Sequence, residues 1–234
     1  MMNILALDTS TDACSAAVLS GDVCHAEYTV APRAHTRLIL PMIEQVLQQA
    51  GLELPALDAL AFGRGPGAFT GVRIAAGVVQ GLALAADKPV IPVSALATLA
   101  QQAYQEQQAG NVLVAVDARM GEVYWGQYVL QDGRMQLQGT EQVLAPEHTP
   151  LPDETGAADW LAVGSGWREY AAELQPRFAD YVGGYQPEYL PHAEYIATLA
   201  QVALERGEGV DAAAAQPVYL RNKVAQTIRE RAAQ

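Results

Sequence analysis

The feature that most constrains the fold is a predicted helix at residues 70–86 that is apolar on nearly every side. A helix that covers one face of a sheet normally shows one apolar stripe and one polar face. Here the apolar residues, which include Val72, Ile74, Val79 and Leu82, surround the helix. Such a helix must be buried twice, once on its own sheet and once against something else. The chain is therefore predicted to be an α/β protein with a second covering surface.

The first third of the chain alternates predicted strands with predicted helices around this segment. Apolar runs bounded by turn residues predict five short strands, at residues 3–8, 13–19, 23–30, 57–62 and 90–93. Tight turns join the first three, which favours an antiparallel meander. Helices are predicted at residues 34–50, 70–86 and 94–107, with Thr70 and Ser94 as the N-caps of the last two.

A polar, glycine-bearing segment at residues 107–111 marks a predicted boundary in the chain. It divides an N-terminal subdomain, residues 1–108, from a C-terminal subdomain, residues 109–220. In the second part, strands are predicted at residues 112–116, 122–130 and 160–163, and a helix at residues 192–205. Residues 221–234 hold four Lys or Arg against one Glu and show little hydrophobic patterning, so we expect a loose tail.

The two halves share a pattern at their starts. Each begins with an apolar strand that ends in an aspartate, Asp8 in the first and Asp117 in the second, and continues with a turn and another strand. A duplicated βββαβα unit explains this similarity, and so does chance; the residues alone leave both open. Either aspartate could hold a metal–nucleotide, or it could shape its turn by accepting backbone hydrogen bonds.

Residues 63–71 form a glycine-rich turn between a predicted strand and the apolar helix. Backbone N–H groups in such a turn, together with the positive end of the helix, can bind an anion such as phosphate. The segment lacks the Gly-Lys-Ser/Thr ending of a Walker A loop, and Pro66 interrupts its glycines, unlike in the dinucleotide fingerprint. A tight connection that needs close backbone packing is the other interpretation, and these residues favour it.

The earlier helix, residues 34–50, is also apolar over a wide arc that includes Ile39, Ile43 and Val46. Two interpretations of the two helices remain open. Either the second subdomain covers both, or their outer sides form an apolar surface that a partner subunit covers. In the second case Gly77 would let a partner helix approach closely, and two helices from each partner would make a four-helix interface.

Patterns typical of catalysis or metal binding are weak. The four histidines are scattered, and none pairs with another at i,i+4: His25, His35, His148 and His192. Two cysteines, Cys14 and Cys24, are too few for a disulfide framework or a structural zinc site. The sequence has no Gly-x-Ser-x-Gly nucleophile elbow. We therefore expect neither a metal nor a catalytic residue, and surface or interface ion pairs for Arg73 and Arg119.

The charge balance narrows the possible partners. The chain holds 14 Lys and Arg against 26 Asp and Glu, which gives a formal net charge of −12. Binding to nucleic acid and to anionic membranes both draw on positive charge, so we expect neither from this chain alone. The first residues lack the basic segment of a signal peptide, and the apolar stretch 74–86 is shorter than the ~20 residues of a membrane span. We expect a cytoplasmic protein.

Several motifs together resemble the TsaB (YeaZ) family. The most specific pair is GRGPGAFTGVRIA at residues 63–75 and DARMGEVYW at residues 117–125, supported by residues 7–10, 32–36 and 217–221. The similarity spans most of the chain and is densest in residues 1–130. It implies an α/β fold of the actin-like ATPase/sugar kinase/Hsp70 (ASKHA) type, made of two related βββαβα subdomains.

The resemblance also implies a function. Members of this family help to make N6-threonylcarbamoyladenosine at position 37 of tRNA, as the non-catalytic scaffold of a threonylcarbamoyltransferase complex. The chain would bind and activate a paralogous catalytic subunit, TsaD, and a small ATPase, TsaE, would join them. Homodimers would use the same two helices. The partners would hold most of the tRNA, and ATP or ADP would bind only in the heterocomplex.

Under this hypothesis the partner-binding residues lie on the two apolar helices: Leu38, Pro41, Met42, Gln45, Phe69, Thr70, Val72, Arg73, Ala76, Gly77, Gln80 and Leu84. Degenerate nucleotide or phosphate loops would include Asp8, Thr9, Ser10, Asp117 and Arg119. Residues 8–11 lack the glycines and lysine that kinases of this fold use.

The catalytic paralogue carries two metal-binding histidines four residues apart, beyond its glycine loop and the helix that follows. The matching stretch here, residues 93–99, has no histidine, and Ala95 and Leu99 cannot bind a metal. This difference predicts a subunit without its own catalytic centre. Two alternatives within the same fold are a nucleotide-dependent phosphotransferase and a peptidase-like hydrolase.

Overall fold

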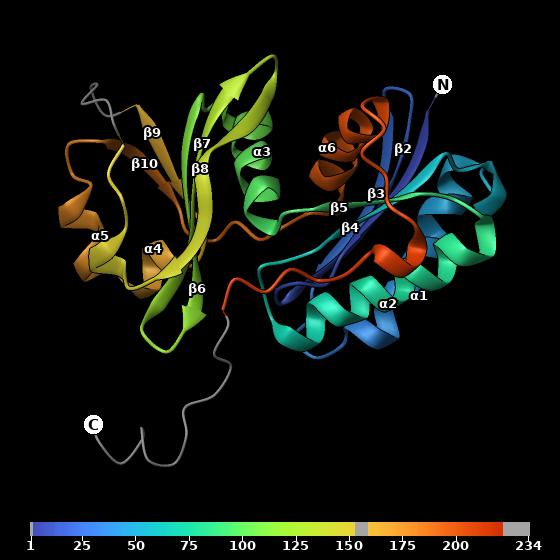
Figure 1. The fold of residues 1–234 in the computed structure, drawn as a ribbon, viewed down its shortest axis with the longest axis horizontal. Coiled ribbons are helices and arrows are strands. Elements are labelled where there is room, and N and C mark those ends of the chain that lie inside the picture. Colours follow the sequence, from blue (N-terminus) through green and yellow to red (C-terminus); the bar gives the residue numbers. More distant parts are fainter. Residues whose placement is uncertain (1, 153–158, 222–234) are drawn as a thin grey trace, which may run out of the picture.

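A computed structural model describes residues 2–152 and 159–221 of the chain. It contains two mixed five-stranded sheets, which Figure 1 shows side by side with their helices. The first has the order β3-β2-β1-β4-β5 and comprises β1 (Asn3–Asp8), β2 (Ala13–Ser20), β3 (Val23–Val30), β4 (Ala59–Gly63) and β5 (Val90–Val93). The second has the order β10-β9-β6-β7-β8 and comprises β6 (Asn111–Arg119), β7 (Glu122–Gln131), β8 (Arg134–Leu144), β9 (Trp160–Val163) and β10 (Val182–Gln186).

The two sheets have the same topology, which decides between duplication and chance. In each sheet the first three strands form an antiparallel meander. The fourth strand pairs in parallel with the first, and the fifth pairs in parallel with the fourth. The antiparallel meander and the duplicated layout predicted from sequence are both confirmed. The duplicated unit is longer than the predicted βββαβα, because a fifth strand closes each sheet.

Within the described residues, six α-helices pack against these sheets: α1 (His35–Ala50), α2 (Phe69–Ala86), α3 (Ala95–Gln107), α4 (Gly166–Glu169), α5 (Ala171–Arg177) and α6 (Ala193–Glu205). Short 3₁₀ turns occur at Leu54–Ala56, Pro146–His148 and Ala212–Ala214. We call the first sheet with α1, α2 and α6 the first lobe, and the second sheet with α3, α4 and α5 the second lobe.

The last helix of each half packs on the sheet of the other half. Helix α3 follows β5 of the first sheet, yet Leu96 and Leu99 pack with Val112 of the second sheet. Helix α6 follows β10 of the second sheet, yet Ile196 packs with Ile4 of the first. Figure 1 shows these two helices facing each other between the sheets.

This exchange gives a different division of the chain from the predicted subdomains, 1–108 and 109–220. Residues 95–107 lie in the second lobe, and residues 193–219 return to the first lobe. The apolar periodicity of a helix shows that one face is buried, but it does not show which sheet that face meets.

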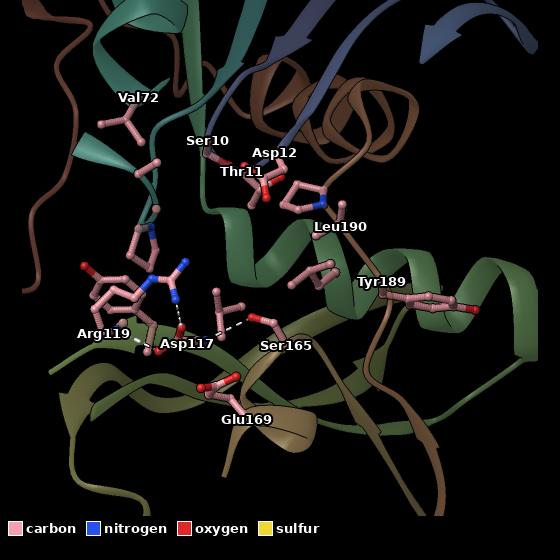
Figure 2. A pocket seen from close by; sticks show the side chains of 18 of the residues that line it. Ser10, Thr11, Asp12, Val72, Asp117, Arg119, Ser165, Glu169, Tyr189 and Leu190 are labelled. Carbon is pink, nitrogen blue, oxygen red and sulfur yellow. Dashed lines mark hydrogen bonds and ion pairs between the residues drawn. The ribbon is translucent and has the colours of Figure 1, made fainter. Parts of the chain in front are cut away.

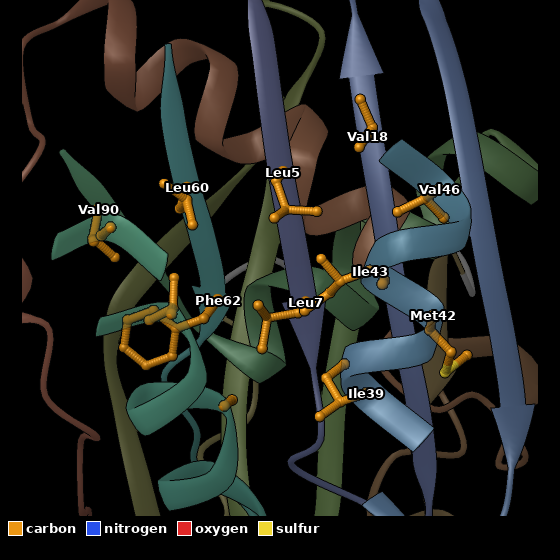
Figure 3. Packing of buried hydrophobic residues seen from close by; sticks show 14 of the residues in the cluster. Leu5, Leu7, Val18, Ile39, Met42, Ile43, Val46, Leu60, Phe62 and Val90 are labelled. Carbon is orange, nitrogen blue, oxygen red and sulfur yellow. The ribbon is translucent and has the colours of Figure 1, made fainter. Parts of the chain in front are cut away.

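The first sheet is covered on both faces, and its core is mostly aliphatic. Because side chains alternate along a strand, Leu5 and Leu7 face α1 and α2, whereas Ile4 and Ala6 face α6. Figure 3 shows the α1 side of this core, with Ile43 of α1 packed over β1. All the strand residues named here are fully buried.

The second sheet uses large aromatic rings on the face that α4 and α5 cover. Trp125 of β7 lies 5.2 Å from the ring of Phe178 and 6.0 Å from that of Trp167. The indole N–H of Trp167 donates a hydrogen bond to the carbonyl of Leu113 at 3.2 Å. Three bulky rings therefore replace the long helices that cover the corresponding face of the first sheet.

The predicted helix starts were right in one case and wrong in another. Ser94 is the N-cap of α3, and its Oγ accepts hydrogen bonds from the backbone N–H groups of Leu96 and Ala97. The prediction for Thr70 was wrong: α2 begins one residue earlier, at Phe69, and its N-cap is Ala68, which offers no side-chain cap.

By length and composition, α2 is also the one helix among the described residues that could cross a membrane. Here α2 packs on the first sheet through Ala75, Val79 and Ala83. A core helix passes the same test of length and composition, so the test does not make α2 a membrane span.

Candidate docking face and cleft

Helices α1 and α2 bury one side against the first sheet, and three predicted partner-binding residues lie on that buried side. Met42, Val72 and Ala76 are 8%, 1% and 5% exposed. They belong to the chain's own interior and are not offered to a partner. The periodicity of the sequence showed that these helices are apolar on more than one side, but it did not show which side faces the sheet and which faces outward.

The remaining predicted residues of α2 are mostly on the surface. Thr70, Arg73, Gly77 and Leu84 follow one another at helical spacing and are all exposed. Leu84 is 79% exposed, and a Cβ added at Gly77 would meet no atom within 4 Å. These four residues form an exposed stripe along α2, and the chain's own Tyr219 packs beside Arg73 in it.

Helix α1 lies beside α2 and adds to this surface. Pro41 and Gln45 are exposed, and Leu38 is half-buried. We call the exposed side of the two helices the outer helix face: Pro41, Gln45, Thr70, Arg73, Gly77 and Leu84. The second lobe does not cover this face. The first of the two interpretations of these helices, in which the second subdomain covers both, therefore does not hold for the outer helix face.

The chain's own C-terminal segment covers one flank of α2. Gln80 donates from Nε2 to the carbonyl of Ala215 at 3.0 Å, and Ala215 is fully buried in the core of the first lobe. Figure 1 shows this segment running along α2 toward the second lobe. Gln80, which was predicted to bind a partner, is half-buried and makes this hydrogen bond within the chain.

At the N-terminal end of α2, an exposed aromatic and cationic cluster joins the C-terminal segment to the helix. The guanidinium carbon of Arg73 lies 3.3 Å from the ring centroid of Phe69 and 5.2 Å from that of Tyr219. The two rings are about half-exposed. Among the described residues Arg73 therefore makes a cation–π contact and not the ion pair expected for it.

A cleft of about 640 Å³ lies between the two lobes, at the ends of β1 and β6. Figure 2 shows Ser10 and Asp12 on one side of it, and Asp117 and Glu169 on the other. Four carboxylates and three guanidinium groups line the cleft: Asp12, Asp117, Glu169, Glu188, Arg119, Arg168 and Arg221.

Asp8 does not reach this cleft, because it is buried under the glycine-rich turn. Its Oδ1 accepts hydrogen bonds from the backbone N and the Oγ of Ser10, each at 2.9 Å. Its Oδ2 has no partner among the described residues. Burial raises the pKa of Asp8 to about 7, although the bonds from Ser10 lower it. Thr9 is equally buried and donates to the carbonyl of Gly71 at 2.7 Å.

The glycine-rich turn packs closely on residues 8–10. A Cβ at Gly63 would lie 1.8 Å from Oδ2 of Asp8, and one at Gly71 would lie 1.9 Å from the carbonyl oxygen of Thr9. The N–H of Ala68, at the start of α2, already donates to the carbonyl of Ser10 at 2.7 Å. Close packing, the structural interpretation of this turn, is confirmed.

Asp117 lies at the equivalent place in the second lobe and lines the cleft. Its Oδ1 accepts from the backbone N of Arg119 at 2.8 Å and from the hydroxyl of Tyr170 at 3.0 Å. Its Oδ2 lies 3.0 Å from Nη1 of Arg119. Burial and the Asp117 carboxylate together raise the pKa of Tyr170 to about 12. The ion pair predicted for Arg119 is present.

Every arginine that lines the described cleft is already paired with a carboxylate. Besides Arg119, Arg168 lies 2.6 Å from Glu188, and Arg221 contacts Glu122. A phosphate entering this cleft would meet arginines whose charge a neighbouring carboxylate already balances. The described residues also contain no group of three or more His, Cys, Asp or Glu arranged to bind a metal ion. Ala95 and Leu99 are buried in the chain's interior.

Two sheets of the same strand order that face each other across a cleft, with their last helices exchanged, define an α/β protein of the ASKHA type. A family model described as "TsaD: tRNA N6-adenosine threonylcarbamoyltransferase" matches residues 15–228. The chain also matches proteins named TsaB and YeaZ over almost its full length. The chain belongs to the TsaB (YeaZ) family.

Relatives support this assignment over almost the full length. The protein named "tRNA threonylcarbamoyladenosine biosynthesis protein TsaB" of Escherichia coli is 42% identical, over 96% of both chains. Its namesake in Haemophilus influenzae is 43% identical, over 95% of both. The solved structure "YeaZ from Pseudomonas aeruginosa" is 51% identical with a TM-score of 0.88, and the match covers 94% of this chain and all of that one.

Proposed function

We propose that this chain is the accessory subunit of a complex that makes threonylcarbamoyladenosine in tRNA, and that it carries no catalytic centre of its own. It binds and activates a catalytic relative of the TsaD type through the outer helix face, and a TsaE-type ATPase joins the two. In the absence of that partner, two copies of the chain use the same face. The complex works in the cytoplasm.

The observation that carries this proposal is the exposed stripe on α2. In α1 and α2 together only Arg37, Glu44 and Arg73 are charged, although the chain as a whole has a net charge of −12. The cores of protein interfaces are similarly poor in charged residues. A stripe that exposes a glycine and a leucine, Gly77 and Leu84, with Arg73 as its one charged residue, suits contact with a partner helix.

The charges in the cleft support the proposal that the nucleotide and the tRNA are bound with the help of the partners. Because each lining arginine is already paired, the isolated chain offers no free cation to a nucleotide phosphate. We therefore expect ATP or ADP to bind only in the heterocomplex and tRNA to be held mainly by the partners. Calorimetry of the isolated chain with Mg-ATP tests this point. Tight one-to-one binding would instead favour the phosphotransferase alternative.

Leu84→Glu and Gly77→Glu test the outer helix face. Both residues are exposed, so we expect the variants to fold normally. A carboxylate buried at an interface without a partner costs about 2 kcal/mol or more, which weakens binding roughly 30-fold. Titration calorimetry with a TsaD-type relative from the same organism measures this loss, and circular dichroism checks the fold.

Leu137→Glu is the matched control, because Leu137 is an exposed leucine on β8 of the second lobe. It should bind as wild type does. Val72→Glu and Ala76→Arg are unsuitable tests, since both side chains are buried within the chain. Normal affinity in both Leu84→Glu and Gly77→Glu would contradict the docking assignment.

A further inference from the structure

Residues 216–221, which we call the strap, are attached first to the first lobe (Figure 1). The N–H of Val218 donates to the carbonyl of Arg64 at 2.8 Å. The ring of Tyr219 lies beside the aromatic and cationic cluster of α2, 5.2 Å from the guanidinium carbon of Arg73. This part of the strap therefore contacts the outer helix face directly.

The strap ends on the second lobe through Arg221. Nη2 of Arg221 ion-pairs with the carboxylate of Glu122 and also donates to the carbonyl of Arg119 at 3.1 Å. Nη1 lies 3.0 Å from Sδ of Met120. The Arg221 side chain is only 14% exposed, so water screens this ion pair less than it screens a surface pair.

The strap lines the cleft, contacts both lobes and is too short to follow a wide opening. Val218, Tyr219 and Arg221 all line the cleft. Three residues of fully extended chain reach about 11 Å at most, which limits the distance between Val218 and Arg221. If the lobes move apart, either the contacts of Arg221 or those of Val218 and Tyr219 must break.

We propose that the strap is a latch that holds the cleft closed and links its opening to the outer helix face. Arg73 is the point where the two meet, because it packs on the strap and is exposed to a partner. A partner carboxylate that pairs with Arg73 draws the guanidinium away from Tyr219. The strap then loosens, Arg221 leaves Glu122, and the cleft opens. These last steps, from partner binding to opening of the cleft, rest on the proposed function.

Distances between the lobes of the free chain test the latch. Spin labels are placed at two exposed positions outside the cleft, Glu205→Cys on α6 and Gln175→Cys on α5, in a Cys24→Ser background that leaves only the fully buried Cys14. Pulsed electron paramagnetic resonance then gives the distribution of distances. We expect Arg221→Gln and Glu122→Gln each to shift it to longer values, and the double variant to add little.

Tyr219→Ala tests whether the link runs through the strap. This variant keeps both Arg221 and Glu122 but removes the aromatic contact with α2. It should therefore also shift the distances between the lobes to longer values. Arg168→Gln is the control: it breaks another Arg–Glu pair that lines the cleft but joins α4 to the segment after β10. It should leave the distances unchanged. Wild-type distances in both Arg221→Gln and Glu122→Gln overturn the latch, and wild-type distances in Tyr219→Ala alone overturn the link.

Binding to a TsaD-type relative gives a second readout. Coupling between two sites is reciprocal, so an already opened latch should strengthen partner binding by about fivefold in Arg221→Gln. Unchanged affinity in this variant contradicts the link to docking. If the wild-type chain does not bind the relative at all, the proposed function fails, while the distances in the free chain still decide whether the strap is a latch.

Discussion

The two lobes share one strand order but differ in what covers their sheets. In the first lobe β3 leads into the 16-residue helix α1, whereas in the second lobe a 3₁₀ turn follows β8 within the described residues. The helices α4 and α5 have only four and seven residues, against 18 in α2. Long helices give the first lobe a surface large enough for docking. In the second lobe aromatic rings cover the core, and no helical surface of that size results.

The two strand-end aspartates show the same divergence at the cleft. Asp8 is fully buried, and one of its oxygens has no partner in the part of the chain that the structure describes, whereas Asp117 lines the cleft and is paired with Arg119. In the first lobe the glycine-rich turn is pressed onto the aspartate. A duplicated backbone can therefore keep its geometry while one copy of a polar residue becomes structural and the other stays accessible.

Among the variants that compare the two lobes, Gly71→Ala should cause the largest loss of stability. A methyl group there would lie 1.9 Å from the backbone oxygen of Thr9, which cannot move aside without shifting β1. In the second lobe a Cβ at Gly166, the first residue of α4, would lie 3.0 Å from the nearest atoms of Ala115. We expect Gly71→Ala to lower the free energy of unfolding by about 3 kcal/mol, and Gly166→Ala by about 1 kcal/mol.

Urea unfolding measures both changes. Gly77→Ala is the control in the same helix as Gly71, because its added methyl group meets open space. Since alanine favours a helix over glycine by about 1 kcal/mol, this variant should be slightly more stable than wild type. Equal losses in Gly71→Ala and Gly166→Ala would show that the two turns are packed alike.

Asp8→Asn tests the difference between the aspartates through pH. The pKa of Asp8 is raised by burial from 3.8 in the unfolded chain to about 7 in the folded protein. The folded state therefore binds the proton more tightly, and the contribution of Asp8 to stability is full below about pH 4. It falls as pH rises toward 7, by an amount on the order of 2 kcal/mol or more.

The measurement is the free energy of unfolding between pH 4 and 8 for wild type and Asp8→Asn. Asparagine stays uncharged, so the difference between the two proteins should move in favour of the variant as pH rises. A difference that does not change with pH would mean that Asp8 stays ionised throughout. Asp117→Asn removes only the contact with the exposed Arg119 and should cost about 1 kcal/mol or less at neutral pH.

Much of the first lobe could be predicted from the sequence, because its signals are local. Strand runs, the tight turns and the Ser94 cap each depend on a few neighbouring residues. Strands β8 and β10 were not predicted, because their local signals are weak. The middle of β8 is polar and exposed, and β10 contains two glycines. Such strands need little apolar patterning, because each lies at the edge of the second sheet.

The candidate site was predictable at the level of elements but not of individual side chains. Periodicity identified α1 and α2 as the outer surface, yet it placed Met42, Val72 and Ala76 on that surface although they are buried. Gln80 is satisfied by Ala215, a residue 135 positions away in the sequence. A contact at that separation leaves no trace in local spacing, so the cover over α2 could come only from the structure.

A smaller effect than that of Gly71→Ala is expected at the caps of the exchanged helices. Ser94 caps α3 by accepting two backbone hydrogen bonds, and it also donates to Glu141 of β8. His192 caps α6 through Nδ1, which accepts one hydrogen bond from the N–H of Glu194 at 3.1 Å. Both helices start at a crossing between the lobes, but only Ser94 also bonds to a strand of the second lobe.

We expect Ser94→Ala to lower the free energy of unfolding by about 1–2 kcal/mol, because it removes both the cap and the bond to Glu141. Ser94→Asp is the informative partner variant: it can keep the cap, but it places a second carboxylate beside Glu141. If Ser94→Asp is as stable as wild type, the cap alone accounts for the role of Ser94. If it loses as much as Ser94→Ala, the bond to β8 matters more, and the exchanged helix is fixed mainly by the lobe that it joins.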